Sequence, residues 1–181
     1  MPKITTKRDD ILRKAEILEM LSSDCEPWLK ALIALLWIYG KRISETLAVK
    51  RSDIWRDKKY LYVRFHVLKK KGRKDAPIPK PYIKKKTLRH SGAKYILEYL
   101  AGLEDEKLFH ISRELARYYL RKINPKAWFH LFRESLATEM AEHGASEEQL
   151  LTWFDWEKAD QAHEYVKHGT KLIEIEADRV D

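Results

Sequence analysis

Apolar residues recur at helical spacing along most of the chain. Residues 9–21 predict an amphipathic helix, whose apolar face consists of Ile11, Leu12, Ala15, Leu18 and Leu21. The stretch Trp28–Tyr39 is apolar on every side, with Pro27 before it and Gly40 after it, and predicts a buried helix. A further helix is expected within residues 41–54. The same spacing returns in five later segments, 88–100, 112–123, 129–143, 146–154 and 158–168.

The pattern changes to a period of two between Tyr60 and Leu68, which predicts a strand with one buried face. The apolar face of this strand consists of Leu61, Val63, Phe65 and Val67. The loop 69–74 turns the chain, and residues 75–79 are expected to return as a short edge strand because they contain two prolines. The expected fold class is α+β, mainly helical, with one small antiparallel β-sheet built on a basic hairpin.

The chain has 181 residues, 44% of them hydrophobic, which is enough for one domain with its own core. No repeat, low-complexity tract or Gly/Ser linker divides it, so residues 1–181 are expected to form a single domain. No segment has the ~18 consecutive apolar residues of a membrane span, and the N-terminus lacks a signal-peptide core, so a cytoplasmic protein is expected. A single cysteine, Cys25, excludes an internal disulfide and a thiolate zinc cage.

The net charge of +8 is concentrated in one window of the chain. Residues 58–89 contain thirteen Lys and Arg residues and a single acid, Asp75, whereas the remainder carries a small negative charge. Such a window is typical of a surface that binds a polyanion, and nucleic acid is the leading candidate. A solvated lysine-rich loop is the alternative. A membrane surface is disfavoured because the window alternates like a strand and forms no basic amphipathic helix.

Two sets of cations are candidate DNA contacts. Side chains at the tip of a basic hairpin can reach into a groove and bind phosphates, and here they are Lys70, Lys71, Arg73 and Lys74. On the expected helix 112–123, cations recur at every fourth residue, at Arg113, Arg117 and Arg121. Such a face can lie along a major groove, although a solvated surface helix would have the same spacing.

Several residues gain meaning only through their order along the chain. His130 and Arg133 share one face of a helix, and Trp156 would by itself indicate core packing, while Tyr165 is one of nine tyrosines. Taken in order along the chain, however, five elements together resemble the tyrosine recombinase, or phage integrase, family. They are G-K-R-I-S-E at 40–45, the basic hairpin, H-x-x-R at 130–133, Trp156, and Tyr165 nine residues after it. The resemblance extends over about residues 11–165.

The resemblance implies the fold of a tyrosine recombinase catalytic domain and a site-specific recombinase or integrase. Such an enzyme cleaves and rejoins DNA through a 3′-phosphotyrosine intermediate. Arg42 and Arg133 match the two arginines that clamp the scissile phosphate, a task that suits planar, permanently charged guanidinium groups. Tyr165 matches the nucleophile. His130 fits the base that accepts the tyrosine proton, because a phenol with a pKa of about 10 is a poor nucleophile at neutral pH.

The family's hairpin lysine protonates the departing 5′-oxygen. Counting back eight residues from Pro77 selects Lys69, while Lys70 and Lys71 stay open as alternatives. Trp156 stands where most members carry histidine, so we expect its indole N–H to support the phosphate without moving a proton. Asp155 stands where the family usually has glycine, which leaves the geometry next to Trp156 open.

The resemblance also implies partners and an assembly. Only the catalytic domain fits in this chain, so the N-terminal core-binding domain of the family is expected to be absent. We expect double-stranded DNA with a specific recombination site as the partner, a monomer free in solution and a tetramer on DNA. Residues 169–181 are expected either to dock onto a neighbouring protomer in trans or to form a solvated tail.

Neither a cofactor nor a metal is expected. A tyrosyl link conserves the energy of the phosphodiester bond, the chain has no G-x-x-x-x-G-K-[ST] loop, and its histidines form no ligand set with acidic partners. Two alternatives remain at this point. One is DNA relaxation like that of type IB topoisomerases, which use similar residues, and the other is a DNA-binding relic that has lost its chemistry.

Overall fold

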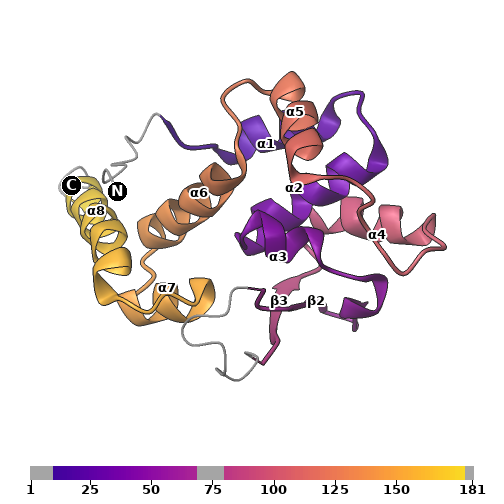
Figure 1. Cartoon of the computed structure of the whole chain (residues 1–181). Coiled ribbons are helices and arrows are strands. Elements are labelled where there is room, and N and C mark those ends of the chain that lie inside the picture. Colours follow the sequence, from indigo (N-terminus) through magenta and orange to yellow (C-terminus); the bar gives the residue numbers. More distant parts are fainter. Residues whose placement is uncertain (1–9, 69–79, 178–181) are drawn as a thin grey trace.

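A computed structural model of the chain describes residues 10–68 and 80–177, with side chains up to residue 169. Helices make up most of this part, and three strands form one antiparallel sheet (Figure 1). The helices are α1 (Lys14–Ser22), α2 (Pro27–Tyr39), α3 (Ile43–Leu47), η2 (Arg51–Asp53, a 3-10 turn), α4 (Ala93–Ala101), α5 (Arg113–Ile123), α6 (Phe129–Glu142), α7 (Glu147–Phe154) and α8 (Ala159–Ala177). The strands are β1 (Ile54–Arg56), β2 (Tyr60–Phe65) and β3 (Tyr82–Thr87). The predicted class, mainly helical α+β, is confirmed.

Helix α2 lies at the centre of the larger hydrophobic core. Every residue from Ala31 to Tyr39 is buried, and the helix packs against α1, α4 and α6. Pro27 occupies its first position, and Gly40 follows it with φ +60°, a left-handed conformation that favours glycine. A Cβ at Gly40 would also lie 2.9 Å from side-chain atoms of Leu136 and Phe154. Gly40 therefore both ends α2 and lets α6 and α7 approach it closely.

The sheet has the order β1-β2-β3. In β2 the predicted alternation is confirmed at Leu61, Val63 and Phe65, which are buried, but the strand ends at Phe65 and Val67, expected on the same face, is only half-buried. Its antiparallel partner is β3, in a register that pairs Tyr60 with Thr87 and Phe65 with Tyr82. The strand that pairs with β2 thus begins later than the predicted return at residues 75–79, which, like the loop 69–74, lie outside the described residues.

Some predicted helix boundaries were wrong. Ile11 and Leu12 are buried but precede α1, because the Leu12 N–H donates to Ser135 Oγ at 2.8 Å and this tertiary contact replaces a helical one. Helix α3 is only five residues long, and the rest of the expected helix within 41–54 forms η2 and the start of β1. Helix α4 begins five residues later than expected. Helix α8 continues to Ala177, well beyond the predicted end at His168.

Helix α6 joins two hydrophobic clusters. Its first part, with Leu131 and Phe132, belongs to the core around α2 and the sheet. Its second part, with Leu136 and Ala137, packs with α7 and α8 in a smaller cluster. Figure 1 shows α6 between these two groups of elements. Arg133 lies on α6 where the clusters meet. None of the described helices combines the length and apolar character that a membrane crossing requires.

Candidate active site

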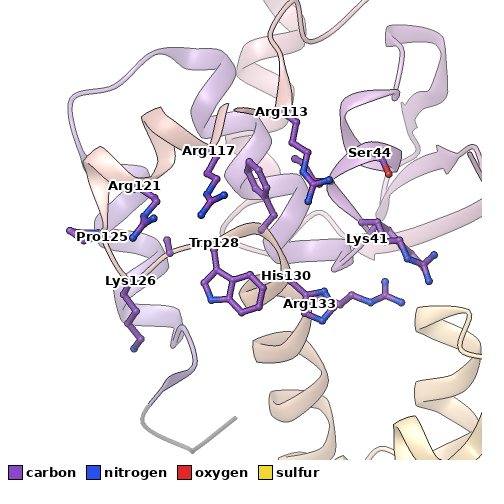
Figure 2. Close-up of a pocket in the computed structure, with 14 residues that line it drawn as sticks. Lys41, Ser44, Arg113, Arg117, Arg121, Pro125, Lys126, Trp128, His130 and Arg133 are labelled. Carbon is purple, nitrogen blue, oxygen red and sulfur yellow. The ribbon is translucent and has the colours of Figure 1, made fainter. Parts of the chain in front are cut away.

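A pocket of about 560 Å³ is formed by α5, the start of α6 and the turn between α2 and α3. Figure 2 shows the arginines of α5 pointing toward the side of the pocket where Trp128 and His130 lie. Of the described residues that line this pocket, none is Asp or Glu, and seven are cationic: Lys41, Arg42, Arg113, Arg117, Arg121, Lys126 and Arg133. The charge of this lining favours an anion such as a DNA phosphate.

Glu45 orients Arg42 at the start of α3. The Arg42 backbone N–H donates to Glu45 Oε2, and its Nη1 donates to Glu45 Oε1, both at 3.3 Å. Glu45 is buried, and its Oε2 also accepts a hydrogen bond from the Tyr82 hydroxyl at 3.2 Å. Burial and this carboxylate raise the pKa of Tyr82, which keeps the hydroxyl available as a donor. Glu45, the acidic residue of G-K-R-I-S-E, therefore holds Arg42 at the N-terminal end of α3, where the arginine is partly exposed and lines the pocket.

Arg133 is buried and holds three segments together. Its Nη1 donates to the Gly40 carbonyl oxygen at 2.9 Å, and its Nη2 donates to the Phe154 carbonyl oxygen at 2.6 Å. A guanidinium has five N–H donors, so these two bonds leave donors for a phosphate oxygen. Burial and the neighbouring Arg42 lower the pKa of Arg133 to about 10, which leaves it charged at neutral pH.

His130 lies in the first turn of α6 and lines the same pocket. Its Nε2 is 3.4 Å from Oε1 of the buried Glu134, one turn along the helix, and its ring is 5.5 Å from the Trp128 ring. Burial, followed by the charges of Arg133 and Arg42, lowers the pKa of His130. The imidazole is therefore mainly neutral at neutral pH and able to accept a proton.

Three cations bind the carbonyl groups at the C-terminal end of α7. Lys84 Nζ donates to the Thr152 oxygen at 2.9 Å, Lys41 Nζ donates to the Trp153 oxygen, and Arg133 binds the Phe154 oxygen. The last carbonyls of a helix have no partner within the helix and carry partial negative charge, so cations stabilise them. The chain then turns at Asp155, whose φ of 54° is left-handed.

Trp156 follows this turn and connects Arg133 with Tyr165. The Arg133 guanidinium carbon is 5.7 Å from the Trp156 ring centroid, and the Trp156 and Tyr165 rings are stacked at 5.5 Å with an interplanar angle of 15°. Burial raises the pKa of Tyr165 to about 12, with Glu134 adding to the rise and Arg133 opposing it. The phenol is thus a weaker acid than a free tyrosine and needs a base to become a nucleophile.

The structure brings together several of the residues predicted from the sequence. Arg42, His130 and Arg133 line one pocket with the three arginines of α5. Trp156 and Tyr165 are not among the described residues of that lining, and Arg133 and Trp156 connect them to it. The general-acid candidate Lys69 and the loop cations Lys70, Lys71, Arg73 and Lys74 lie outside the described residues.

Sequence reasoning missed two cations of the site. Lys41 lies inside the quoted G-K-R-I-S-E motif, and Lys84 lies in the basic window, but neither had a signal that distinguished it from its neighbours. Trp128 was missed as well, although it lies beside His130 in the pocket wall and is 36% exposed. Within the described part of the chain, no group of three or more His, Cys, Asp or Glu side chains could hold a metal ion.

The chain belongs to the phage integrase family, whose model matches residues 10–171. This match covers the G-K-R-I-S-E turn, the His130–Arg133 pair and Tyr165. A comparison with curated proteins gave no match.

Solved structures of recombinases have a similar fold. The pre-cleavage complex of the XerH site-specific recombinase with difH substrate gives a TM-score of 0.65 at 14% identity, over 86% of this chain and 49% of that one. The post-cleavage complex of XerH with palindromic difH gives 0.66 at 15%, over 92% and 52%. The XerA recombinase gives 0.63 at 17%, over 86% and 58%. The chain spans about half the length of these proteins.

Proposed function

We propose that this chain is the catalytic domain of a site-specific DNA recombinase that cleaves and rejoins DNA through a 3′-phosphotyrosine on Tyr165. The observation that carries the proposal is the junction at Arg133. One side of this residue belongs to a cationic pocket with Arg42 and His130, and the other contacts Trp156, which stacks on Tyr165. The Arg133 guanidinium group therefore links Tyr165, the candidate nucleophile, through Trp156 to the pocket that contains the candidate phosphate-binding residues.

Arg42 and Arg133 bind the non-bridging oxygens of the scissile phosphate in this proposal. Their charges stabilise the negative charge that grows on these oxygens as phosphorus becomes five-coordinate. Glu45 holds Arg42, and the Gly40 and Phe154 carbonyls hold Arg133, so both arginines are oriented before DNA binds. Such preorganisation lowers the barrier because the groups do not have to be reoriented during the reaction.

Each proton has a donor and an acceptor. The Tyr165 oxygen attacks phosphorus and forms the new O–P bond, while its proton passes to His130. The bond from phosphorus to the 5′-oxygen breaks, and Lys69 supplies the proton that this oxygen needs, with Lys70 and Lys71 as alternatives. In rejoining, a 5′-hydroxyl attacks the phosphotyrosine and the same protons return. The Trp156 indole N–H supports the phosphate as a hydrogen-bond donor and transfers no proton.

The proposed partner is double-stranded DNA inside the cell. Arg113, Arg117 and Arg121 recur along one face of α5 and share the pocket with Arg42, so they are proposed to bind the phosphates next to the cleaved one. By the family resemblance we also propose a monomer in solution and a tetramer on DNA. Within the tail 169–181, Gly169 packs on α6 of its own chain, so the part that follows it is proposed to dock in trans. Sedimentation of the protein with and without its DNA site tests this assembly.

A trapping experiment tests the proposed reaction. Duplexes of randomised sequence, each with one 5′-bridging phosphorothiolate, are incubated with the protein, denatured, and examined for protein-linked DNA. The sulfur leaving group does not rejoin efficiently, so adducts accumulate. We expect adducts that share a sequence and that disappear in the Tyr165→Phe variant.

The outcomes separate the alternatives. If no adduct depends on Tyr165, the catalytic proposal fails and the DNA-binding relic is favoured. If adducts form on an unmodified nicked duplex of the recovered sequence and their DNA is then transferred to a second duplex, the protein is a recombinase. Adducts that only reseal, with relaxation of supercoiled plasmid, would instead indicate topoisomerase-like activity.

A further inference from the structure

Lys41 and Asp155 form an ion pair between two turns that are far apart in the sequence. Lys41 Nζ donates to Asp155 Oδ2 at 2.8 Å, across 114 positions. The same ammonium donates to the Trp153 carbonyl oxygen and lies 4.5 Å from the centroid of the Tyr82 ring. Lys41 is the residue between Gly40 and Arg42, and Asp155 is the residue between α7 and Trp156. The pair thus connects the phosphate-binding turn to the turn that precedes the nucleophile helix.

The two partners differ in their exposure to water. Lys41 is 1% exposed, whereas the Asp155 side chain is 42% exposed. Burial is the main cause of the lowered pKa of Lys41, which falls to about 8, and Asp155 opposes this fall. Arg133 and Lys84 contribute further positive charge close to the ammonium. Asp155 is therefore the carboxylate that compensates a buried cation, while Asp155 itself would remain hydrated without Lys41.

The backbone at Asp155 is also unusual for this residue type. It is the one described non-glycine residue with positive φ, a conformation in which glycine has no steric penalty. Asp and Asn tolerate it better than other side chains, although it remains less favourable for them than for glycine. Asp155 thus stands where glycine would fit with the least strain, and the contact of its carboxylate with Lys41 offsets the backbone strain.

We propose that Lys41 and Asp155 act together as positioning residues for the reaction. Their ion pair holds the turn between α7 and α8 in the position in which Trp156 and Tyr165 face Arg133. This inference rests on the proposed function. The pair touches neither phosphate nor leaving group in the proposed reaction. Its contribution is to fix the distance between the Arg42–Arg133 site and the start of α8. A misplacement of about 1 Å can slow a reaction by about a hundredfold, so such a contribution is measurable.

A double-mutant cycle on the full chain tests the coupling. The variants are Asp155→Asn, Lys41→Met and the two combined. Asn keeps the tolerance for a left-handed backbone and removes only the charge, and Met fills the space of the lysine stem without an ammonium. Asp105→Asn is the matched control, because Asp105 is an exposed acid that contacts the exposed His110 and does not line the pocket. The rate of adduct formation is measured at saturating DNA, and the Kd for DNA is measured separately in the Tyr165→Phe background.

We expect Asp155→Asn to slow adduct formation by about tenfold or more and to change the Kd for DNA by less than about threefold. In the Lys41→Met background the same replacement should have almost no effect, because Asp155 acts through Lys41. The Asp105→Asn control should cleave like the wild type. If Asp155→Asn cleaves at the wild-type rate, or slows cleavage equally in both backgrounds, the proposal is wrong.

A second readout keeps the test independent of folding and of the proposed function. Hydrogen exchange should increase in the amides of residues 155–168 in Asp155→Asn and remain unchanged in α5. If Asp155→Asn does not fold but the double variant does, the coupling is demonstrated by that rescue. If neither folds while Lys41→Met does, Asp155 acts without Lys41 and the proposal is overturned. If the wild-type protein forms no Tyr165-dependent adducts, the proposed function is refuted. Hydrogen exchange would still show whether the Lys41–Asp155 ion pair holds residues 155–168 in place.

Discussion

The indole ring of Trp156 stacks on the phenol ring of Tyr165, with centroids 5.5 Å apart and planes inclined by 15°. Phe154 stacks on the same indole at 4.8 Å, so three aromatic rings lie together at the end of α7 and the start of α8. Aromatic pairs contribute about 0.5–1.5 kcal/mol beyond the area that they bury. The stacking makes Trp156 a packing surface for Tyr165, a role that is separable from the hydrogen bond to phosphate that we propose for its indole N–H.

Replacements of Trp156 should separate these roles. Trp156→Phe keeps a ring and loses the N–H, and we expect cleavage to slow by about tenfold, the equivalent of one hydrogen bond. Trp156→His restores a ring N–H and should be closer to the wild type. Trp156→Ala should be slowest, because Tyr165 also loses its neighbour. Single-turnover cleavage rates check this order, and a Trp156→Phe variant with unchanged rate would exclude the hydrogen bond to phosphate.

The pH dependence of cleavage should report on His130. Its pKa is lowered, and it must be neutral to accept the Tyr165 proton, so the rate should decrease only when pH falls through a value below the usual 6.5. Between that pH and about 8, where Lys41 begins to lose the proton that its ion pair with Asp155 needs, the wild-type rate should be nearly constant. The expected profile is measured as single-turnover cleavage on a phosphorothiolate duplex, which removes the need for the leaving-group acid.

The His130→Ala variant provides the contrasting profile. Without a base, only the phenolate of Tyr165 reacts, and the pKa of Tyr165 is raised to about 12. The phenolate fraction then increases about tenfold per pH unit across neutral pH, and the cleavage rate should increase with it. A His130→Ala profile as flat as that of the wild type would show that another group accepts the proton.

The chain's own sequence predicted those parts of the site that depend on local spacing. His130 and Arg133 share a face because they are three residues apart on a helix, and Gly40 ends α2 because it takes a left-handed φ. The partnership of Lys41 with Asp155 could not be predicted in the same way, since it spans 114 positions and depends on how α7 packs against α2. Long-range pairs of this kind have no periodic signal.

The errors in the sheet and in α1 also have physical causes. Strand β3 has no fully buried residue, and its alternation of half-buried and exposed side chains includes three consecutive lysines, so it lacks the apolar period that made β2 recognisable. Strand β1 has only three residues, too few for a period. Ile11 and Leu12 have helical spacing with later apolar residues, but a contact with Ser135 on α6 decides their conformation.

Sulfur substitution in the substrate should identify the general acid among Lys69, Lys70 and Lys71. Each single lysine-to-alanine variant is compared on a normal duplex and on one with a 5′-bridging sulfur. A thiolate leaves without a proton, so the general-acid variant should be slow only on the normal duplex. Variants that lose a phosphate contact should be slow on both. Rescue of Lys70→Ala or Lys71→Ala, with no rescue of Lys69→Ala, would contradict the choice of Lys69.

The arginines of α5 should contribute to the salt dependence of DNA binding. Removing one phosphate contact by Arg117→Ala should reduce the slope of log Kd against log salt by about 0.9, because one fewer counterion is released. Lys94→Ala on α4 is the control, since this residue does not line the pocket. Binding isotherms at several salt concentrations, in the Tyr165→Phe background, give both slopes. Equal slopes for Arg117→Ala and the wild type would place Arg117 outside the interface.

Gly169 should be essential for the position of α8, the helix that carries Tyr165. A Cβ at this residue would lie 2.1 Å from the Ala141 carbonyl oxygen, a backbone atom that cannot move aside without displacing α6. Tyr165 lies one helical turn earlier on α8, so a shift of α8 would carry it away from Trp156. We expect Gly169→Ala to lower the free energy of unfolding by about 1–3 kcal/mol or more and to slow cleavage.

Gly102→Ala is the matched control for this last replacement. A Cβ there would have its nearest neighbour, the Tyr99 carbonyl oxygen, at 3.9 Å, which is ordinary van der Waals contact, and Gly102 has negative φ. Its unfolding midpoint in urea should therefore differ little from that of the wild type. If Gly169→Ala is as stable and as active as Gly102→Ala, then α8 does not depend on close contact with α6. The position of Tyr165 would in that case be set by the turn at Asp155 and by the contact with Trp156.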